Sequence, residues 1–170
     1  MSEQCEVALA TRDVRYLPQL MLASPTDVRR WLAGKMDGKR LAELQGLLRS
    51  LPALRLALTP PATALEPNAD GVVTVAIEGT NPASRRHVYA PAFPKPKIGG
   101  WWLVMGDEDE LFALKRVQLP PRGTFKTDLH FMAPEEPGEF EFDVYLVSDS
   151  YIGLDQHHRV QVTVIADPHF

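Results

Sequence analysis

Two short stretches of this sequence hold side chains of the types that bind metal ions. The run Asp107–Glu110 places four carboxylates in succession, and carboxylate oxygens are the ligands that Ca²⁺ prefers. His157 and His158 offer ring nitrogens of the kind that bind zinc, but neighbouring residues on a strand point apart. Neither stretch has the regularly placed glycine of a calcium-binding loop or further ligand residues elsewhere in the chain that would complete a metal site. We therefore expect a solvated hairpin turn, exposed loop histidines and no cofactor.

The motifs that bind nucleotides or activate nucleophiles are missing from the sequence. It contains no GxxxxGKS/T loop to hold phosphates, no GxGxxG turn and no GxSxG nucleophile elbow. Cys5 is the single cysteine, so it cannot form an internal disulfide, which fits a reducing compartment. We expect Cys5 to be an inert thiol in an N-terminal tail, and the chain to have no catalytic activity of its own.

The pair Trp101 and Trp102 opens a predicted strand, on which the two rings must face opposite sides of the sheet. Trp101 alternates with Leu103 and Met105, so we expect Trp101 in the core. Trp102 faces the other way. It is a candidate anchor for a partner protein, unless the helical segment or the loop at Phe93–Pro94 covers it.

A polar loop at 148–156 interrupts the strongest pair of predicted strands. Asp149 and Asp155 can each accept backbone N–H bonds, and Gly153 permits a positive φ, which favours a self-bonded structural loop over a direct partner site. Both functions stay open at this point. The candidate partner-binding residues are Trp102, Phe93, Lys97, Tyr151, Asp149 and Asp155.

Charge is distributed unevenly along the chain. The whole sequence has a net charge of -4, which divides into +3 for residues 1–58 and -7 for the remainder. Phosphate backbones attract clustered positive charge, so any RNA contact should be weak and confined to the first part. These basic residues equally fit two solvated helix faces. The candidate nucleic-acid contacts are Arg29, Arg30, Lys35, Lys39 and Arg40.

The first part of the chain has the signals of two short helices. Ser24 is a helix N-cap followed by proline, and the apolar spacing predicts a helix over 25–33 that Gly34 closes. Asp37 is a plausible second cap, and Pro52 ends the second helix. We expect the apolar stripe of this helix to pack on the β-rich part; its members are Leu41, Leu44, Leu47, Leu48 and Leu51.

From about residue 54 the apolar pattern becomes alternating, as expected of half-buried strands. The predicted strands are 54–59, 72–78, 101–106, 111–119, 124–132, 139–147 and 158–165. About seven such strands favour a mainly β chain with an antiparallel, immunoglobulin-like or fibronectin type III-like sandwich. The expected organisation is a tail at 1–11, a helix-loop-helix segment at 12–53, the sandwich at 54–167 and a tail at 168–170.

Several motifs, in order, resemble those of the Sec sixty-three homology domain of Ski-two-like helicases. They are APAFPKPKIGGWWLVMGD at 90–107, LFALKRV at 111–117, APEEPGEFEFDVYLVSDSYIGLDQ at 133–156, and the VQVTV strand that follows. The resemblance covers roughly residues 12–166. FPKPK, GWW and ALKRV look closer to the helicase branch, which includes spliceosomal and signal-cointegrator helicases, than to the translocon branch.

The resemblance implies a helix-loop-helix and an immunoglobulin-like sandwich that brace helicase motor domains and bind other subunits of a ribonucleoprotein or cointegrator complex. It also implies a nuclear location, with the cytoplasm as the alternative, and helical parts that can touch RNA. We expect no membrane partner. The helicase motor and ratchet bundle are not among these residues, so fragment and free-standing module both stay open. The alternatives are a cytosolic domain of an endoplasmic-reticulum translocation subunit and a stand-alone calcium- or lipid-binding sandwich.

Overall fold

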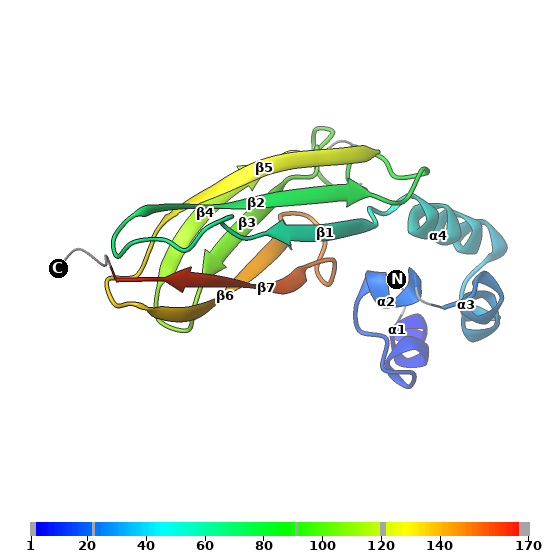
Figure 1. The fold of residues 1–170 in the computed structure, drawn as a ribbon. Helices are drawn as coiled ribbons and strands as arrows, with labels where there is room; N and C mark the ends of the chain where they lie inside the picture. The colour runs from blue at the N-terminus through cyan, green and yellow to red at the C-terminus, as the bar shows by residue number, and fades with distance from the viewer. Residues whose placement is uncertain (1–2, 22, 91, 120–121, 167–170) are drawn as a thin grey trace.

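A helical segment lies at one end of an elongated β-sandwich in the computed structural model (Figure 1). The structure describes residues 3–21, 23–90, 92–119 and 122–166. The helices are α1 (Glu3–Ala10), α2 (Leu17–Met21), α3 (Pro25–Leu32) and α4 (Gly38–Ser50). The strands are β1 (Leu54–Thr59), β2 (Asp70–Gly79), β3 (Trp101–Gly106), β4 (Leu111–Val117), β5 (Gly123–Met132), β6 (Gly138–Ser148) and β7 (Gln156–Val164). None of the helices in these ranges is long and apolar enough to span a membrane.

The N-terminal residues form helix α1, where the sequence predicted a tail. Cys5 and Leu9 are buried on its inner side, in a cluster with residues of the other helices, and the Cys5 thiol donates a hydrogen bond to the Lys35 carbonyl at 3.2 Å. The prediction of a tail was wrong because apolar residues lie on both sides of this helix: Cys5 and Leu9 face inward and are buried, whereas Val7 faces outward and is exposed. Sequence spacing alone therefore provided no amphipathic signal. The predicted tail at 168–170 lies outside the described residues.

The predicted caps of α3 and α4 are confirmed. The Ser24 hydroxyl accepts a hydrogen bond from the Asp27 N–H at 3.0 Å, and the Asp37 carboxylate accepts one from the Arg40 N–H at 2.8 Å. Gly34 has φ of 74°, in the left-handed region that ends helices. The two helices are thus delimited by local side-chain chemistry.

Three of the five leucines in the α4 stripe pack on the other helices, where we expected the stripe to pack on the sandwich. Leu41, Leu44 and Leu48 contact a small cluster that also holds Val28 and Leu32. The reason is that α1, α2 and α3 supply enough apolar surface to cover the stripe. The helical segment therefore has a core separate from that of the sandwich.

A polar clamp holds the end of α4 to the sandwich. The Asn81 side-chain amide, just after β2, donates hydrogen bonds to the carbonyls of Arg49 at 2.8 Å and Leu51 at 2.7 Å. The Arg85 N–H donates to the Ser50 carbonyl at 3.2 Å. These bonds satisfy carbonyls that the helix end leaves without partners. The clamp fixes where the helical segment joins the sandwich.

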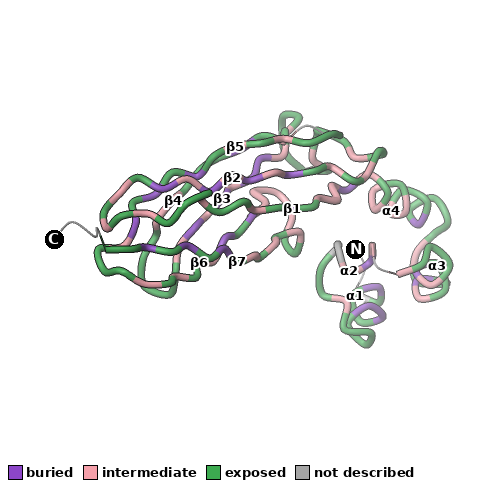
Figure 2. Tube along the Cα trace, viewed as in Figure 1, coloured by how far each residue is buried: buried purple, intermediate pink, exposed green. Residues whose placement is uncertain are grey.

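The sandwich consists of a 3-stranded sheet of order β1-β2-β5 and a 4-stranded sheet of order β4-β3-β6-β7. Neighbouring strands pair antiparallel, and each predicted strand has a counterpart whose ends differ by no more than two residues. Buried positions alternate along the strands and face the other sheet (Figure 2). Trp101, Leu103 and Met105 are buried there, as predicted. The mainly β, immunoglobulin-like architecture is confirmed.

Candidate interaction site

The Asp149 carboxylate, directly after β6, holds together three segments that are distant in sequence. Its Oδ1 atom accepts a hydrogen bond from the Gly100 N–H at 2.9 Å, and its Oδ2 atom accepts one from the Arg116 guanidinium at 3.2 Å. The Lys97 ammonium donates to the Asp149 carbonyl at 2.9 Å and lies 3.4 Å from Oδ1. We call Lys97, Gly100, Arg116, Asp149 and Ser150 the Asp149 cluster.

The environment of Asp149 favours the ionised carboxylate. Burial raises the pKa of Asp149, but hydrogen bonds from the Ser150 hydroxyl and the Gly100 N–H, together with the Lys97 charge, outweigh burial and hold the pKa below its ordinary value. The side chain is only 16% exposed. An ionised carboxylate in this position links the segment before β3, the edge strand β4 and the loop after β6 at neutral pH.

Trp102 is half-buried on the outer side of β3. The Arg116 guanidinium carbon lies 5.7 Å from the centre of the Trp102 ring, within range of a cation–π interaction. The same guanidinium binds Asp149, so the Trp102 ring is tied to the Asp149 cluster. The sequence suggested the helices or the loop at Phe93–Pro94 as the cover of this ring. Arg116 of the neighbouring strand is the cation that lies over it.

Three other candidate residues differ in what they contact. The Tyr151 hydroxyl accepts a hydrogen bond from the Tyr89 N–H at 3.1 Å, which joins the two loops at this end of the sandwich. The Asp155 carboxylate accepts a bond from the Ser148 N–H at 2.8 Å, which is a bond within its own loop. Phe93 is 56% exposed, and in the described ranges no ring contact joins it to the Asp149 cluster.

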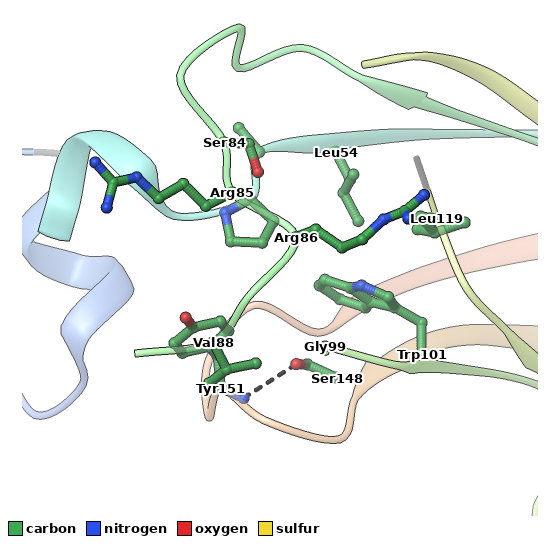
Figure 3. Close-up of a pocket in the computed structure, with 12 residues that line it drawn as sticks. Leu54, Ser84, Arg85, Arg86, Val88, Gly99, Trp101, Leu119, Ser148 and Tyr151 are labelled. Atoms are coloured by element: carbon green, nitrogen blue, oxygen red, sulfur yellow. Dashed lines mark hydrogen bonds between the residues drawn. The ribbon is translucent and has the colours of Figure 1, made fainter. Parts of the chain in front are cut away.

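A small cavity lies among the loops at this end of the sandwich. Its volume is about 40 Å³, and Figure 3 shows Trp101, Arg86 and Tyr151 around it, with the Tyr151 N–H bonded to the Ser148 hydroxyl at 3.0 Å. Small-molecule pockets are commonly about 300–1,000 Å³. This cavity is smaller than such pockets, whereas the adjoining groove beside Trp101 and Gly153, of about 340 Å³, falls within their range.

The outer face of the 4-stranded sheet carries an apolar stripe. Register places Arg116, Trp102 and Val147 in one row, and Leu114, Val104, Tyr145 and His157 in the next. Leu114 is 55% exposed and Tyr145 39%. Neither residue was among the candidates named from the sequence. The available signal was that β6 is apolar on both faces at this point, because Tyr145 and Val147 alternate with core residues.

His157 and Asp143 extend this face toward a charged region. The His157 ring stacks on Tyr145 with centroids 4.6 Å apart, and its Nε2 atom lies 2.6 Å from Asp143 Oδ1. The hydrogen bond from His157 lowers the pKa of Asp143 more than burial raises it, and the charge of Arg159 adds to the lowering. His158 lies beside Gln156 at 3.4 Å, so the two histidines point apart, as predicted. Both lie on strand β7, where we expected an exposed loop, and His158 is half-buried.

The expected hairpin turn between β3 and β4 is present, and its first carboxylate binds the backbone. Asp107 Oδ1 accepts hydrogen bonds from the N–H groups of Asp109 at 2.9 Å and Glu110 at 2.8 Å. Within the described ranges, His, Cys, Asp and Glu residues form no group of three or more that could hold a metal ion. The geometry of this turn is that of a self-bonded loop.

Two of the five candidate nucleic-acid residues pair with neighbouring acids. Arg30 lies 2.6 Å from Asp27, and Arg40 lies 3.5 Å from Asp37. Arg29 and Lys39 are exposed. Lys35 and Arg40 line a groove of about 410 Å³ between α4 and the sandwich, together with Cys5, Met36, Glu43, Leu44, Leu47 and Tyr89. Tyr89, which sequence reasoning did not single out, is the only member of this lining from the sandwich part.

The sequence profile of the Sec63 Brl domain matches residues 5–161. The chain belongs to this family. The match begins within α1, so the helix that sequence analysis read as a tail is part of the Brl domain.

Relatives of this Brl domain include proteins named as helicases. Subunit 3 of the activating signal cointegrator 1 complex from Mus musculus is 43% identical over 81 residues, which cover 46% of this chain and 4% of that protein. The DExH-box ATP-dependent RNA helicase DExH12 from Arabidopsis thaliana is 46% identical over 74 residues, 42% of this chain and 3% of that protein. The U5 small nuclear ribonucleoprotein 200 kDa helicase from Caenorhabditis elegans is 32% identical over 135 residues, 76% of this chain and 6% of that protein.

Among solved structures, a CARDB domain from Pyrococcus furiosus is similar at 12% identity with a TM-score of 0.45, over 69% of this chain and 97% of that chain. The chain spans only a few per cent of the length of its helicase relatives.

The motifs that resemble the family meet in space at the Asp149 cluster. Lys97 and Gly100 lie in the first motif, Arg116 in the second and Asp149 in the third. Their hydrogen bonds connect segments up to 52 residues apart. The family motifs of this Brl domain therefore join the segment before β3, strand β4 and the loop after β6, and we call this junction the loop corner.

Proposed function

We propose that this Brl domain is a non-catalytic interaction and scaffolding module of a Ski-two-like RNA helicase, where it braces the motor domains and docks partner proteins. The observation that carries the proposal is the Asp149 cluster, in which one carboxylate holds three motif segments. A surface fixed in advance by such bonds loses less conformational entropy when a partner binds.

The named relatives support the helicase branch of the family. One is the helicase of the U5 small nuclear ribonucleoprotein and another is a subunit of the activating signal cointegrator 1 complex. By analogy, we propose a nuclear protein that acts in pre-mRNA splicing, with motor domains and other complex subunits as its partners. The candidate contact residues are those named from the sequence, with Trp102 as the central one.

The first test is the coding sequence that flanks this domain. A DExH-box motor in the same reading frame is the expected result. Transmembrane segments in that frame would contradict the proposal and favour a translocation subunit. Where the motor is found, its purified domains are titrated with the 170-residue chain, and we expect saturable binding.

A second test asks whether the chain has chemistry of its own. We expect purified chain to hydrolyse no ATP, because no phosphate-binding loop is present in its sequence. ATP turnover that a substitution within these residues abolishes would overturn the non-catalytic proposal.

RNA contact is a minor part of the proposal. Arg29, Lys35 and Lys39 are exposed on the helical segment. The ion pairs of Arg30 and Arg40 reduce the charge that these two side chains offer to phosphates. We therefore propose weak, salt-sensitive binding that does not involve the sandwich.

A further inference from the structure

The outer face of the 4-stranded sheet has an apolar stripe with no cover from the described helices. The stripe consists of Trp102, Val104, Leu114, Tyr145 and Val147, on the adjacent strands β3, β4 and β6. Leu114 and Tyr145 are exposed, and the other three are half-buried among their neighbours. Contiguous apolar side chains on a sheet face are typical of protein contact surfaces.

One end of this face is acidic. The hairpin Asp107–Glu110 follows β3, and Glu139, Glu141 and Asp143 face outward along β6. Figure 1 shows the hairpin between β3 and β4 at the end of the sandwich away from the helices. We call these residues the acidic end.

The cation within the acidic end is already engaged. Arg159 lies 2.8 Å from Glu141 and 3.2 Å from Asp143, and His157 also binds Asp143. In the described part of the chain, no ion pair involves Glu108, Glu110 or Glu139. The acidic end thus keeps an uncompensated negative charge beside the apolar stripe.

The opposite end of the stripe has no excess of carboxylates, because two cations there share one aspartate. Arg116 lies over Trp102, and Asp149 binds both Arg116 and Lys97. The outer face therefore changes along β3 from an apolar end with one excess cation to an acidic end. A binding partner gains most when its own surface has apolar groups at one end and cations at the other.

We propose that this outer face docks a protein segment in which apolar or aromatic side chains are combined with Lys or Arg, the apolar groups on the stripe and the cations at the acidic end. The inference rests on the proposed interaction function and names the surface and the chemistry of its partner. RNA is a poor occupant, because phosphates and carboxylates repel. A second copy of this chain is also a poor occupant, because its own face carries the same excess of carboxylates and would be repelled.

Peptide selection tests the proposal while the natural partner is unidentified. Random peptides of about twelve residues, long enough to span the face at about 3.3 Å per residue, are displayed on phage and selected on the immobilised 170-residue chain. We expect the enriched sequences to combine aromatic or aliphatic residues with Lys or Arg. Enrichment of acidic sequences, or of none, overturns the proposal.

Matched variants locate the binding site of a selected, synthesised peptide. Leu114→Asp and Glu139→Lys should each weaken binding about tenfold or more. Met132→Asp changes a side chain that is 60% exposed on the other sheet, compared with 55% for Leu114, and should leave binding unchanged. Equal losses in Leu114→Asp and Met132→Asp overturn the proposal, and thermal melts check that each variant is folded.

Other occupants give distinct results. A dimer in sedimentation that Leu114→Asp dissociates would assign the face to a second copy, and RNA binding that Leu114→Asp abolishes would assign it to nucleic acid; both overturn the proposal. Peptides that bind another surface refute this face but leave the interaction function intact. If the helicase motor domains also fail to bind, the proposed function fails as well.

Discussion

The helical segment and the sandwich differ in how their cores are built. The sandwich core joins side chains from all seven strands. The most extensive strand pairing is between β2 and β5, which are far apart in sequence. The helical core is a smaller cluster, with grooves of about 400 and 430 Å³ beside it. Small clusters of this kind open locally at lower free energy than a long-range core. The sandwich should therefore set global stability, and the helical segment should respond locally.

The largest expected effect comes from the sandwich core. Trp101 is 5% exposed and packs between the sheets, so Trp101→Ala should lower the free energy of unfolding by about 3–5 kcal/mol. Trp102→Ala is the matched control and should cost much less, since its ring is on the outer face. Chemical denaturation of both variants measures the difference. The reverse order of stabilities would show that the two faces of β3 are assigned wrongly.

A helical core substitution tests whether the two regions unfold separately. Leu32 is fully buried, so Leu32→Ala should destabilise the helical segment by about 2–5 kcal/mol. Hydrogen exchange should rise in α1 to α4 and stay unchanged in the strands. A parallel rise in strand exchange would indicate that the two regions form one cooperative unit.

The clamp between the regions should have a smaller effect. Asn81→Ala removes two hydrogen bonds to the end of α4, and we expect a loss of about 1–2 kcal/mol. Exchange should increase at the end of α4 more than in the core strands. Thr80→Ala, which removes a hydroxyl bond to the Ala53 carbonyl, is a neighbouring control with a smaller expected loss. An equal loss in both variants would argue against a special role for Asn81.

Acid should weaken the loop corner through Asp149. The pKa of Asp149 is lower in the folded chain than its ordinary value of 3.8, so its contribution to stability is present above that value and is lost as pH falls through the folded pKa. Stability of Asp149→Asn should fall less steeply below the ordinary pKa. Denaturation at a series of acidic pH values measures the two slopes. Identical slopes would contradict the lowered pKa.

The smallest expected effect concerns RNA. Arg29→Ala with Lys39→Ala removes two exposed cations that form no ion pair among the described residues, and should reduce the salt dependence of any RNA binding. Arg30→Ala with Arg40→Ala removes cations that already pair with aspartates, and should change it less. Fluorescence anisotropy at several salt concentrations compares the variants. Unchanged binding in both would show that these residues only solvate the helices.

Local signals in the sequence were enough for most of the fold. Ser24 and Asp37 cap helices by bonding backbone N–H groups three residues away, and such contacts depend on nearby sequence alone. Alternation along β3 likewise placed Trp101 in the core, because a strand has only two faces. The fold class and the strands therefore followed from the sequence.

Contacts between distant segments required the tertiary structure. Cys5 is buried because residues of the other helices pack against α1, and Leu41, Leu44 and Leu48 of α4 belong to the same cluster. Asp149 looked like a loop residue, and only the approach of Gly100 and Arg116 makes it the centre of a cluster. Periodicity reports which side of an element is apolar. Which neighbour covers that side depends on packing across the whole chain.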